Sequence, residues 1–477
     1  MKDGFTGLLN DYIDKVGVTN NNLIRMTGID RSTFYKILSG KRQPTEEQFK
    51  AIICALSLPR LEEEALRREY VRETLGEEEW QNRQTIRKLL HVLAEPELEV
   101  LCPVETSRPA SVDFQNYTAQ GPDPANQMML RFLQDEFGKE YPRLSFFMPV
   151  DREQFYSVLR DQCTLHAGKQ IQIRQLMQFP TGSTFSKCSI LEYFEHLVYH
   201  LTRGPWDYQA YFYYERALLP TGLGNLFPYY IIAGGKILML NADFTRSMLL
   251  REPEIVSMYE TAFEEALAAS KPIRETIGYA EMLMALEMPG KKISFESIPC
   301  AAMVAKSDYT RKYIADGAFG DFIWNHCKRL QEENELLVFS TMGGLERFAQ
   351  TGQVEEVPSA LMAPMSVEDR IESFENLKAH IQKEYFIVDE TVLPVSSNWM
   401  LTLYEDNTLY IYPRIATGDE QVICVQEKNI INAFTSFFRS LSKGPDVLGK
   451  EKVLMKINEM IETLSNDAFE KEEKEDA

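Results

Sequence analysis

The chain has 477 residues, a formal net charge of −20 and a hydrophobic content of 44%, of which aromatic residues form a large part. This length exceeds a typical domain of ~150 residues, and the apolar content is too high for a disordered chain. We therefore expect several folded domains, with disorder confined to the ends, and an acidic surface that disfavours general binding to polyanions.

The cysteines and the first residues predict a reduced, cytoplasmic, soluble protein. The seven cysteines are scattered and form no Cys-x-x-Cys pair, so they predict neither a zinc ribbon nor a redox motif. The opening stretch, MKDGFTGLLNDYIDK, carries Asp11 and Asp14 where a signal peptide needs an apolar run. No apolar run reaches the ~18 residues of a membrane span, so no membrane partner is expected.

Residues 5–57 are predicted to form short helices. Their apolar residues recur at intervals of three and four, as on one face of a helix, and glycines interrupt this pattern at Gly17, Gly28 and Gly40. Residues 1–58 hold eight Lys and Arg against six Asp and Glu, a net charge of +2, which leaves −22 for the rest of the chain. Any contact with nucleic acid is therefore expected in this segment.

The segment GIDRSTFYKILSGKRQPT, residues 28–45, holds four basic residues and one acidic residue. Gly28 can adopt the positive φ of a tight turn between helices. Asp30 is a good N-cap that can accept a hydrogen bond from the backbone N–H of Ser32 or Thr33. The apolar positions of the following helix face the interior, which leaves its basic and hydroxyl side chains on the outer face.

The longer stretch VTNNNLIRMTGIDRSTFYKILSGKRQPTEEQFKAIICAL resembles the helix-turn-helix of the lambda-repressor-like family, also known as the Cro/repressor or xenobiotic-response-element family. The resemblance covers about residues 5–58 and depends on spacing as well as residue type. Leu23 lies five residues before Gly28, apolar Ile29 follows the glycine, and a Ser-Gly-Lys-Arg corner ends the second helix.

The resemblance implies that residues 31–38 form a recognition helix that enters the DNA major groove. By position in the family pattern, the expected base-reading residues are Arg31, Ser32, Tyr35 and Lys36. Phosphate contacts, which would fix the register of the protein on DNA, are expected from Asn20, Asn21, Ser39, Lys41 and Arg42. Two positions depart from the family pattern: Ile24 stands in place of a small residue, and Leu38 in place of Glu.

Residues 59–128 are predicted to connect this domain with a body. The stretch from Pro59 to about Leu93 is highly charged and helical, with Gly76 as a candidate break. Its apolar stripe either pairs with a second copy of the chain or packs on the chain's own body. That stripe consists of Leu61, Ala65, Val71, Leu75, Ile86, Leu89 and Leu93. Residues 102–127 hold four prolines and are predicted to form a linker.

The body, residues 129–464, is predicted to mix helices with strands. DYQAYFYYE is a predicted strand, and PYYIIAGGKILMLN and WMLTLYEDNTLYIYP are predicted hairpins that turn at residues 234–235 and 406–407. The aromatic side chains of these strands either form core or line a ligand pocket.

An internal similarity predicts that the body is a duplicated module of helix, strand, hairpin and helix. ILEYFEHLVYHL in the first half resembles RIESFENLKAHI in the second, with five identities and the same order of elements behind each. Chance similarity of two amphipathic helices is the alternative. The expected modules are residues 129–290 and 291–464, followed by a disordered acidic tail at residues 465–477.

No catalytic set is recognisable in the sequence. Cys188, Glu192, His196 and His200 recur every four residues, like metal ligands on one helix face, but the second copy does not repeat the set. AGGK lacks the spacing of a phosphate-binding loop, and STMGG lacks the Gly-x-Ser-x-Gly pattern of a nucleophile elbow. We therefore expect no enzyme activity, no metal and no cofactor.

These observations predict an α+β multidomain protein with an N-terminal all-α helix-turn-helix bundle, a helical linker and a larger α+β body. The expected function is that of a sequence-specific DNA-binding transcriptional regulator of bacterial type. Its partners would be a double-stranded DNA operator, a second copy in a homodimer, and a small-molecule or peptide effector. The alternatives are an interaction protein, such as an antitoxin or a mobile-element accessory factor, and an enzyme recruited to DNA by its helix-turn-helix.

Overall fold

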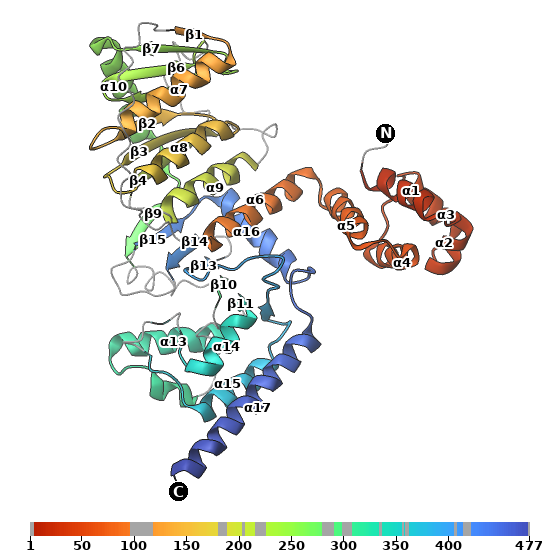
Figure 1. Cartoon of the computed structure of the whole chain (residues 1–477). Helices are drawn as coiled ribbons and strands as arrows, with labels where there is room; N and C mark the ends of the chain where they lie inside the picture. The colour runs from red at the N-terminus through yellow and green to blue at the C-terminus, as the bar shows by residue number, and fades with distance from the viewer. Residues whose placement is uncertain are drawn as a thin grey trace. The chain divides into compact units, whose positions relative to one another are not determined.

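The protein is mixed α+β and divides into two compact units, Met1–Gln84 and Thr85–Ala477 (Figure 1). The α+β class expected from the sequence is confirmed, as is the helical character of the N-terminal region. The computed structural model describes residues 4–95, 118–179, 188–202, 206–214, 226–278, 291–297, 308–332, 336–354, 357, 362–404, 408–413 and 421–475. None of the helices in these ranges is both long and apolar enough to cross a membrane.

The N-terminal unit is a helical bundle with a single apolar core. Its helices are α1 (Phe5–Val16), α2 (Asn20–Thr27), α3 (Arg31–Leu38), α4 (Glu46–Leu56), α5 (Arg60–Leu75) and the first part of α6 (Glu77–Ala94). The apolar residues spaced by three and four, which the sequence predicted to share one face, are buried together at the centre. Thr45 begins α4 with a capping box, in which it exchanges hydrogen bonds with Gln48.

Helix α5 belongs to this bundle, so the domain does not end at residue 58 as the sequence predicted. The ring of Tyr70 stacks on that of Phe49 with centroids 4.0 Å apart, and its hydroxyl donates to the carbonyl of Pro44 at 3.1 Å. Leu66, one turn earlier, is fully buried, whereas Leu61 is 80% exposed. The prediction that Leu61 belongs to the buried face of α5 is therefore wrong, because the buried face contains Leu66 and Tyr70.

Helix α6 is shared between the two units, so residues 59–128 are not a separate connector. Ile86, Leu89 and Leu93 are buried in the main core of the second unit, and Arg87 forms an ion pair with Asp446. Of the two alternatives for the apolar stripe, packing on the chain's own body is therefore the one observed for this part of it. The Pro-rich residues 102–117 lie outside the described ranges.

The first half of the second unit is built on an eight-stranded sheet in the order β1-β7-β6-β5-β2-β3-β4-β8. The strands are β1 (Thr118–Gln120), β2 (Arg143–Phe147), β3 (Gln172–Phe179), β4 (Asp207–Tyr214), β5 (Tyr229–Ala233), β6 (Lys236–Leu240), β7 (Arg246–Leu250) and β8 (Lys271–Pro272). The helices are α7 (Pro122–Phe137), α8 (Glu153–Leu165), α9 (Cys188–Thr202) and α10 (Pro253–Ala269). Helices α7, α8 and α9 share one apolar core with this sheet, whereas α10 packs in a second cluster on its other face.

The second half is built on a seven-stranded sheet in the order β12-β11-β10-β13-β14-β15-β9. The strands are β9 (Glu275–Gly278), β10 (Lys292–Phe295), β11 (Leu336–Ser340), β12 (Tyr385–Ile387), β13 (Trp399–Tyr404), β14 (Thr408–Pro413) and β15 (Gln421–Val425). The described helices are η1 (Asp308–Tyr313), α13 (Ala318–Glu332), α14 (Met342–Thr351), α15 (Val367–Lys378), α16 (Lys428–Leu441) and α17 (Lys450–Glu475).

Seven strands have the same order in both sheets. The order β1-β7-β6-β5-β2-β3-β4 of the first corresponds to β9-β15-β14-β13-β10-β11-β12 of the second. In each half a first strand, β1 or β9, is followed along the chain by three parallel strands and then by an antiparallel meander of three strands. The similar sequences lie in α9 and α15, which precede the corresponding strands β4 and β12. The two halves begin with β1 and β9, at residues 118 and 275, rather than at the predicted residues 129 and 291.

The predicted strands and hairpins of the body are confirmed where the structure describes them. β5 and β6 pair across Gly234 and Gly235, whose φ angles of 56° and 69° are those of a tight hairpin turn. β13 and β14 also pair as a hairpin, although its turn at residues 405–407 lies outside the described ranges. The segment 465–477, predicted to be disordered, is helical as far as Glu475, because α17 continues through it.

One apolar core joins the two halves. The Phe438 ring of α16 lies 5.3 Å from that of Phe295 in β10 and 5.5 Å from that of Phe339 in β11. On its other side α16 meets α9, where the centroids of Phe434 and Phe194 are 6.4 Å apart. The opposite face of the second sheet is covered by α14, α15 and α17, which form a separate apolar cluster with β11 and β12.

Two histidines of α9 pack against the core of the first half: His200 is buried and His196 is half-buried. The His196 ring stacks on Tyr156 at 4.4 Å, and the His200 ring stacks on Tyr208 at 4.6 Å. Among the described residues, neither ring nitrogen of His200 has a hydrogen-bond partner. Burial, with a smaller effect of the cations Arg160 and Lys88, lowers the pKa of His196 to about 4, and burial lowers that of His200 to about 3.

These histidines are expected to destabilise the fold in mild acid. Their folded-state pKa lies below the ordinary 6.5, so the unfolded state binds more protons once the pH falls below that value. Stability should therefore fall from about pH 6.5 towards the folded-state values, by about 2 kcal/mol for each histidine at pH 5. In calorimetric unfolding at pH 7 and pH 5, His200→Phe should reduce the difference between the two melting temperatures. His91→Phe, at an exposed position of α6, should leave it unchanged.

Loss of the Tyr70 side chain is expected to loosen the whole N-terminal bundle. Tyr70→Phe should cost about 1 kcal/mol through the lost hydrogen bond, and Tyr70→Ala about 3–5 kcal/mol through the cavity it leaves. Native-state hydrogen exchange of the amides in α1 and α4 measures both effects. Leu61→Ala on the same helix is the control and should change little. Unchanged protection in Tyr70→Ala would show that α5 does not stabilise the bundle.

Candidate nucleic-acid interface

The turn between α2 and α3 has the local geometry that the sequence predicted. Gly28 ends α2 in the left-handed region with φ 67°, and a Cβ there would meet no neighbouring atom within 4 Å, so the constraint is on the backbone conformation. Asp30 caps α3, because its carboxylate accepts the N–H of Thr33 at 3.1 Å. Hydrogen bonds from Thr33 also hold the pKa of this carboxyl at about 2.

Helix α3 buries one face and exposes the other. Thr33, Phe34, Ile37 and Leu38 are buried in the bundle. The four residues predicted to read bases are all exposed: Arg31, Ser32, Tyr35 and Lys36. The guanidinium carbon of Arg31 lies 5.8 Å from the centroid of the Tyr35 ring, so these two side chains lie next to each other on the outer face.

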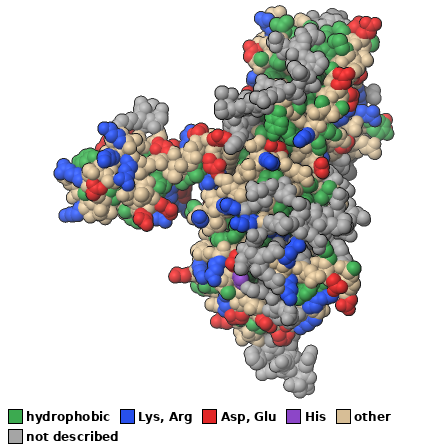
Figure 2. Space-filling view, turned by 180° about the vertical axis from the view of Figure 1, so that it is seen from behind, with side chains coloured by type: hydrophobic (Ala, Val, Ile, Leu, Met, Phe, Trp, Pro, Cys, Tyr) green, Lys and Arg blue, Asp and Glu red, His purple; other side chains and the backbone are tan. Residues whose placement is uncertain are grey.

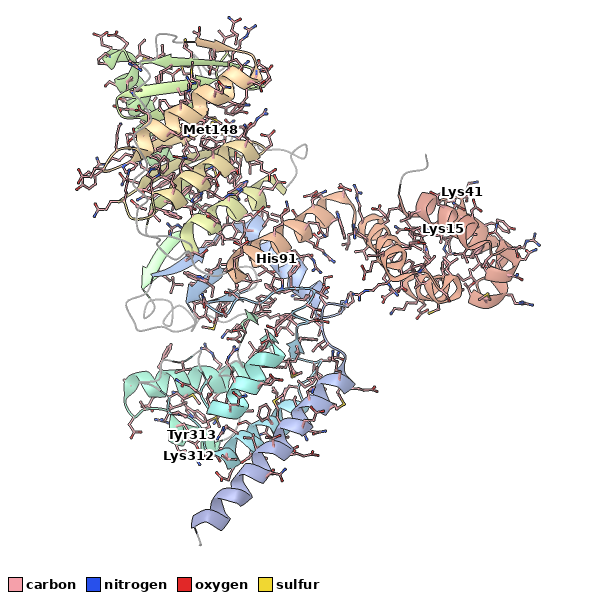
Figure 3. All side chains as sticks on the ribbon, in the orientation of Figure 1. Lys15, Lys41, His91, Met148, Lys312 and Tyr313 are labelled. Carbon is pink, nitrogen blue, oxygen red and sulfur yellow. The ribbon has the colours of Figure 1, made fainter. Side chains whose placement is uncertain are left out.

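The corner after α3 is held by backbone hydrogen bonds. The N–H groups of Lys41 and Arg42 both donate to the carbonyl of Lys36, at 2.9 and 3.3 Å. The hydroxyl of Ser39 donates to the same carbonyl at 3.1 Å, and Gly40 takes a positive φ of 71°. Ser39, Lys41 and Arg42, three of the predicted phosphate contacts, are exposed at this corner. Lys41 is labelled in Figure 3.

The two predicted amide contacts lie in the first turn of α2. Thr19 caps this helix through its hydroxyl, which accepts the N–H of Asn22 at 3.4 Å. Asn21 is exposed, whereas Asn20 is half-buried. The positive end of the α2 dipole lies at these residues, which favours a nearby anion.

The basic residues of the N-terminal unit fall into two groups. Those on α1, α4, α5 and α6 that form ion pairs with carboxylates are Lys15, Lys50, Arg60, Arg67, Arg72 and Arg83. Within the described ranges, no ion pair reaches the basic residues on α2, on α3 or at the corner: Arg25, Arg31, Lys36, Lys41 and Arg42. Figure 2 shows several Lys and Arg side chains close together on the surface of this unit.

The two groups therefore lie on different elements, with one exception: Arg68 of α5 also has no ion pair within the described ranges, although Arg60, Arg67 and Arg72 of the same helix are paired. Like charges repel one another, so a cluster of unpaired cations in a chain of net charge −20 is suited to an anionic partner.

Sequence reasoning missed two residues of this surface. Arg25 and Met26 are exposed on α2, and the side chain of Met26 is 58% exposed. The sequence could have indicated Arg25, because it is the basic residue of α2. The family pattern, however, assigned phosphate contacts only to Asn20 and Asn21 of that helix. Of the two departures from the family pattern, Leu38 is buried in the core and Ile24 packs partly against it.

The described part of the second unit contains no cluster of three or more His, Cys, Asp or Glu arranged to hold a metal. The suspected metal ladder of α9 instead places His196 and His200 against tyrosine rings in the core. The AGGK segment, residues 233–236, forms the tight turn of the β5–β6 hairpin, as the sequence predicted. It joins two antiparallel strands, whereas a phosphate-binding loop leads from a strand into a helix.

No protein-family model matches the chain, and no curated protein matches its sequence. The geometry and charge of the residues on this surface therefore have to indicate what it binds.

Removal of the Asp30 cap is expected to loosen α3. Asp30→Ala should increase the amide exchange rate of Thr33, which loses its acceptor, whereas Asp30→Ser keeps a capping oxygen and should preserve protection. The carboxylate cap contributes fully above the ordinary pKa of 3.8 and is lost as the pH falls through about 2. NMR exchange measurements test this, and equal protection in Asp30→Ala and the unaltered chain would contradict it.

Proposed function

We propose that the protein is a cytoplasmic, sequence-specific DNA-binding transcriptional regulator. In this proposal the N-terminal unit is a helix-turn-helix domain of the lambda-repressor-like type, and α3 is its recognition helix. Arg31, Ser32, Tyr35 and Lys36 read base edges in the major groove. Asn20, Asn21, Ser39, Lys41 and Arg42 contact phosphates and fix the register.

The observation that carries this proposal is the distribution of unpaired cations. Arg31 and Lys36 on α3, and Lys41 and Arg42 at the corner after it, are exposed and have no ion pair among the described residues. Other cations of the same unit pair with Glu. A surface that only had to be soluble would not require this separation, whereas a surface that meets the phosphate backbone would.

The regulator is proposed to act as a homodimer. One small DNA-binding module buries only ~600–1,000 Å² of protein surface, which limits both affinity and specificity. Two copies on half-sites about 34 Å apart would double this contact. The body would then provide oligomerisation or sensing.

We also propose that the body arose by duplication of one α+β module. Support comes from the order of seven strands common to both sheets and from the similar sequences of α9 and α15 before corresponding strands. Two chance amphipathic helices would have no reason to occupy the same place in two sheets of the same order.

Removal of the proposed contacts should abolish selective binding. Selection of a binding site from a random DNA library, followed by footprinting, tests the full-length chain. The triple variant Arg31→Ala, Lys36→Ala, Lys41→Ala should lose at least about 100-fold in affinity, since each base contact is worth ~1–3 kcal/mol. The charge-matched control is Lys50→Ala, Arg60→Ala, Arg67→Ala on α4 and α5. Equal loss in the control, or an unchanged footprint in the first variant, would refute the proposed interface.

The two classes of contact should differ in salt dependence. Lys41→Ala with Arg42→Ala should reduce the slope of log affinity against log salt by about 2, because each phosphate contact contributes ~0.9. The selected sequence should stay the same. Arg31→Ala should instead relax the preference at one base pair, and the same selection experiment detects this.

A further inference from the structure

A pocket of about 290 Å³ lies at one edge of the first sheet. β1, β6 and β2 run parallel to one another, since each is separated from the next by antiparallel neighbours. Their carboxyl ends therefore lie at the same edge, where ligands of α/β sheets commonly bind. The pocket is lined by the segments that leave these three ends: the start of α7, the β6–β7 turn and the start of α8. In Figure 3, Met148 marks the end of β2.

The floor of the pocket is apolar and fixed. Met129, Phe155 and Phe244 line it and are all buried. Phe244 adopts a φ of 58°, which is rare for an aromatic residue. It is held there between the guanidinium of Arg152, 4.4 Å from its ring centroid, and the ring of Tyr229 at 5.5 Å.

One side of the pocket favours a negative group. Helices α7 and α8 both begin at it, and the N-terminus of a helix carries a partial positive charge. Within the described ranges neither helix has a side-chain cap at its N-cap residue, Gly121 or Arg152. Arg152 adds a positive charge that is partly compensated, because its Nε lies 3.8 Å from Oδ1 of Asp151. Its Nη2 donates to the carbonyl of Ala242 at 3.1 Å.

The rim favours a positive group. Asp151, Glu153 and Asp243 line the pocket with exposed carboxylates. The side chain and backbone N–H of Thr245 both donate to Asp243, which lowers the pKa of this carboxyl and keeps it ionised at neutral pH. Asn126 and Gln154 add neutral polar groups to the wall. Arg152 already lies against Asp151, so Glu153 and Asp243 are the rim carboxylates that no ion pair within the described ranges reaches. The pocket thus offers both signs of charge above an apolar floor.

We propose that this pocket binds a zwitterionic small molecule with an apolar substituent, of the class of a free α-amino acid or a dipeptide. Its ammonium group lies against the carboxylates of Glu153 and Asp243, and its carboxylate lies towards Arg152 and the two helix N-termini. Its side chain covers Phe155 and Phe244. The volume is near the lower limit of ~300 Å³ for small-molecule sites, which matches a ligand of this size. A role as effector rests on the proposed function, whereas the binding itself does not.

Isothermal titration of the full-length chain without DNA tests the proposal. The probes are L-phenylalanine, L-leucine, L-methionine and the dipeptide of phenylalanine and leucine. L-phenylalaninamide, which lacks the carboxylate, and N-acetyl-L-phenylalanine, which lacks the ammonium group, are the matched controls. We expect at least one zwitterion to bind with a Kd of about 1 mM or tighter. Both controls should bind at least about tenfold more weakly than their parent.

Substitutions locate the binding in this pocket. Asp243→Asn and Glu153→Gln preserve shape but remove a charge, and each should weaken binding about tenfold. Glu260→Gln, at an exposed position of α10 on the other face of the sheet, should have no effect. If the dipeptide binds more tightly than its component amino acids, the ligand is a peptide. If the amino acids bind more tightly, the ligand is a free amino acid.

Three results would overturn the inference: no binding by any of the four zwitterions, equal binding by the controls that lack a charge, or unchanged binding in both carboxylate variants. None of these would alter the DNA footprint, so failure of this proposal is distinguishable from failure of the proposed interface. Conversely, a footprinting result that refuted the proposed DNA interface would not change the result of the titration.

Discussion

Three strands that run parallel cannot be joined by tight turns, so in each half of the second unit helices have to connect them. α8 and α9 connect β2, β3 and β4, and α13, α14 and α15 lie between β10, β11 and β12. The antiparallel meanders that follow need only short connections, and the one between β5 and β6 is two glycines long. This combination decides where the helices lie, which faces of the sheets are covered, and at which edge the carboxyl ends of β1, β2 and β6 meet.

The helices that pack on the two sheets also explain how the halves form one unit. α10 and α16 follow corresponding strands, but their surroundings differ. α10 exposes polar and acidic residues on its outer side, whereas α16 is buried between the second sheet and α9. The helix α16 carries Phe434, Phe437 and Phe438 towards these neighbours. In the first half this helix has a polar outer face, whereas the second half uses the corresponding helix as an internal layer, which allows a single core to extend across both sheets.

The charge of the chain is distributed unevenly between the N-terminal bundle and the body. Most of the negative charge lies outside residues 1–58, and the cations of α1, α4 and α5, except Arg68, pair with nearby glutamates. The cations of α2, α3 and the following corner are not neutralised in this way among the described residues. An acidic body and a small unpaired basic surface together favour contact with an anionic polymer through that surface alone. The pocket proposed to bind a zwitterion lies in the acidic body, where both signs of charge are provided locally.

Much of the N-terminal unit could be predicted from the sequence, because its signals are local. These signals are the left-handed Gly28, the capping Asp30 and the apolar residues spaced by three and four. Each acts within a few residues along the chain, so it can be recognised without knowledge of tertiary contacts. The same holds for the Gly-Gly hairpin of β5 and β6. By contrast, the phase of α5 was misjudged, since a helix dense in charge gives no clear apolar face and only contact with Phe49 and Pro44 selects Leu66 and Tyr70.

By itself, then, the sequence determined the α+β class, the helices of the bundle, the exposed face of α3 and the paired hairpins. The tertiary structure alone decided the strand order, the starts of the two halves at β1 and β9, the allocation of α6 to both units, and the pocket. The physical reason is distance along the chain. Asn126, Asp151 and Asp243 line one pocket although more than a hundred residues separate the first from the last. Pairing of β6 with its neighbours brings them together, and no local propensity encodes that pairing.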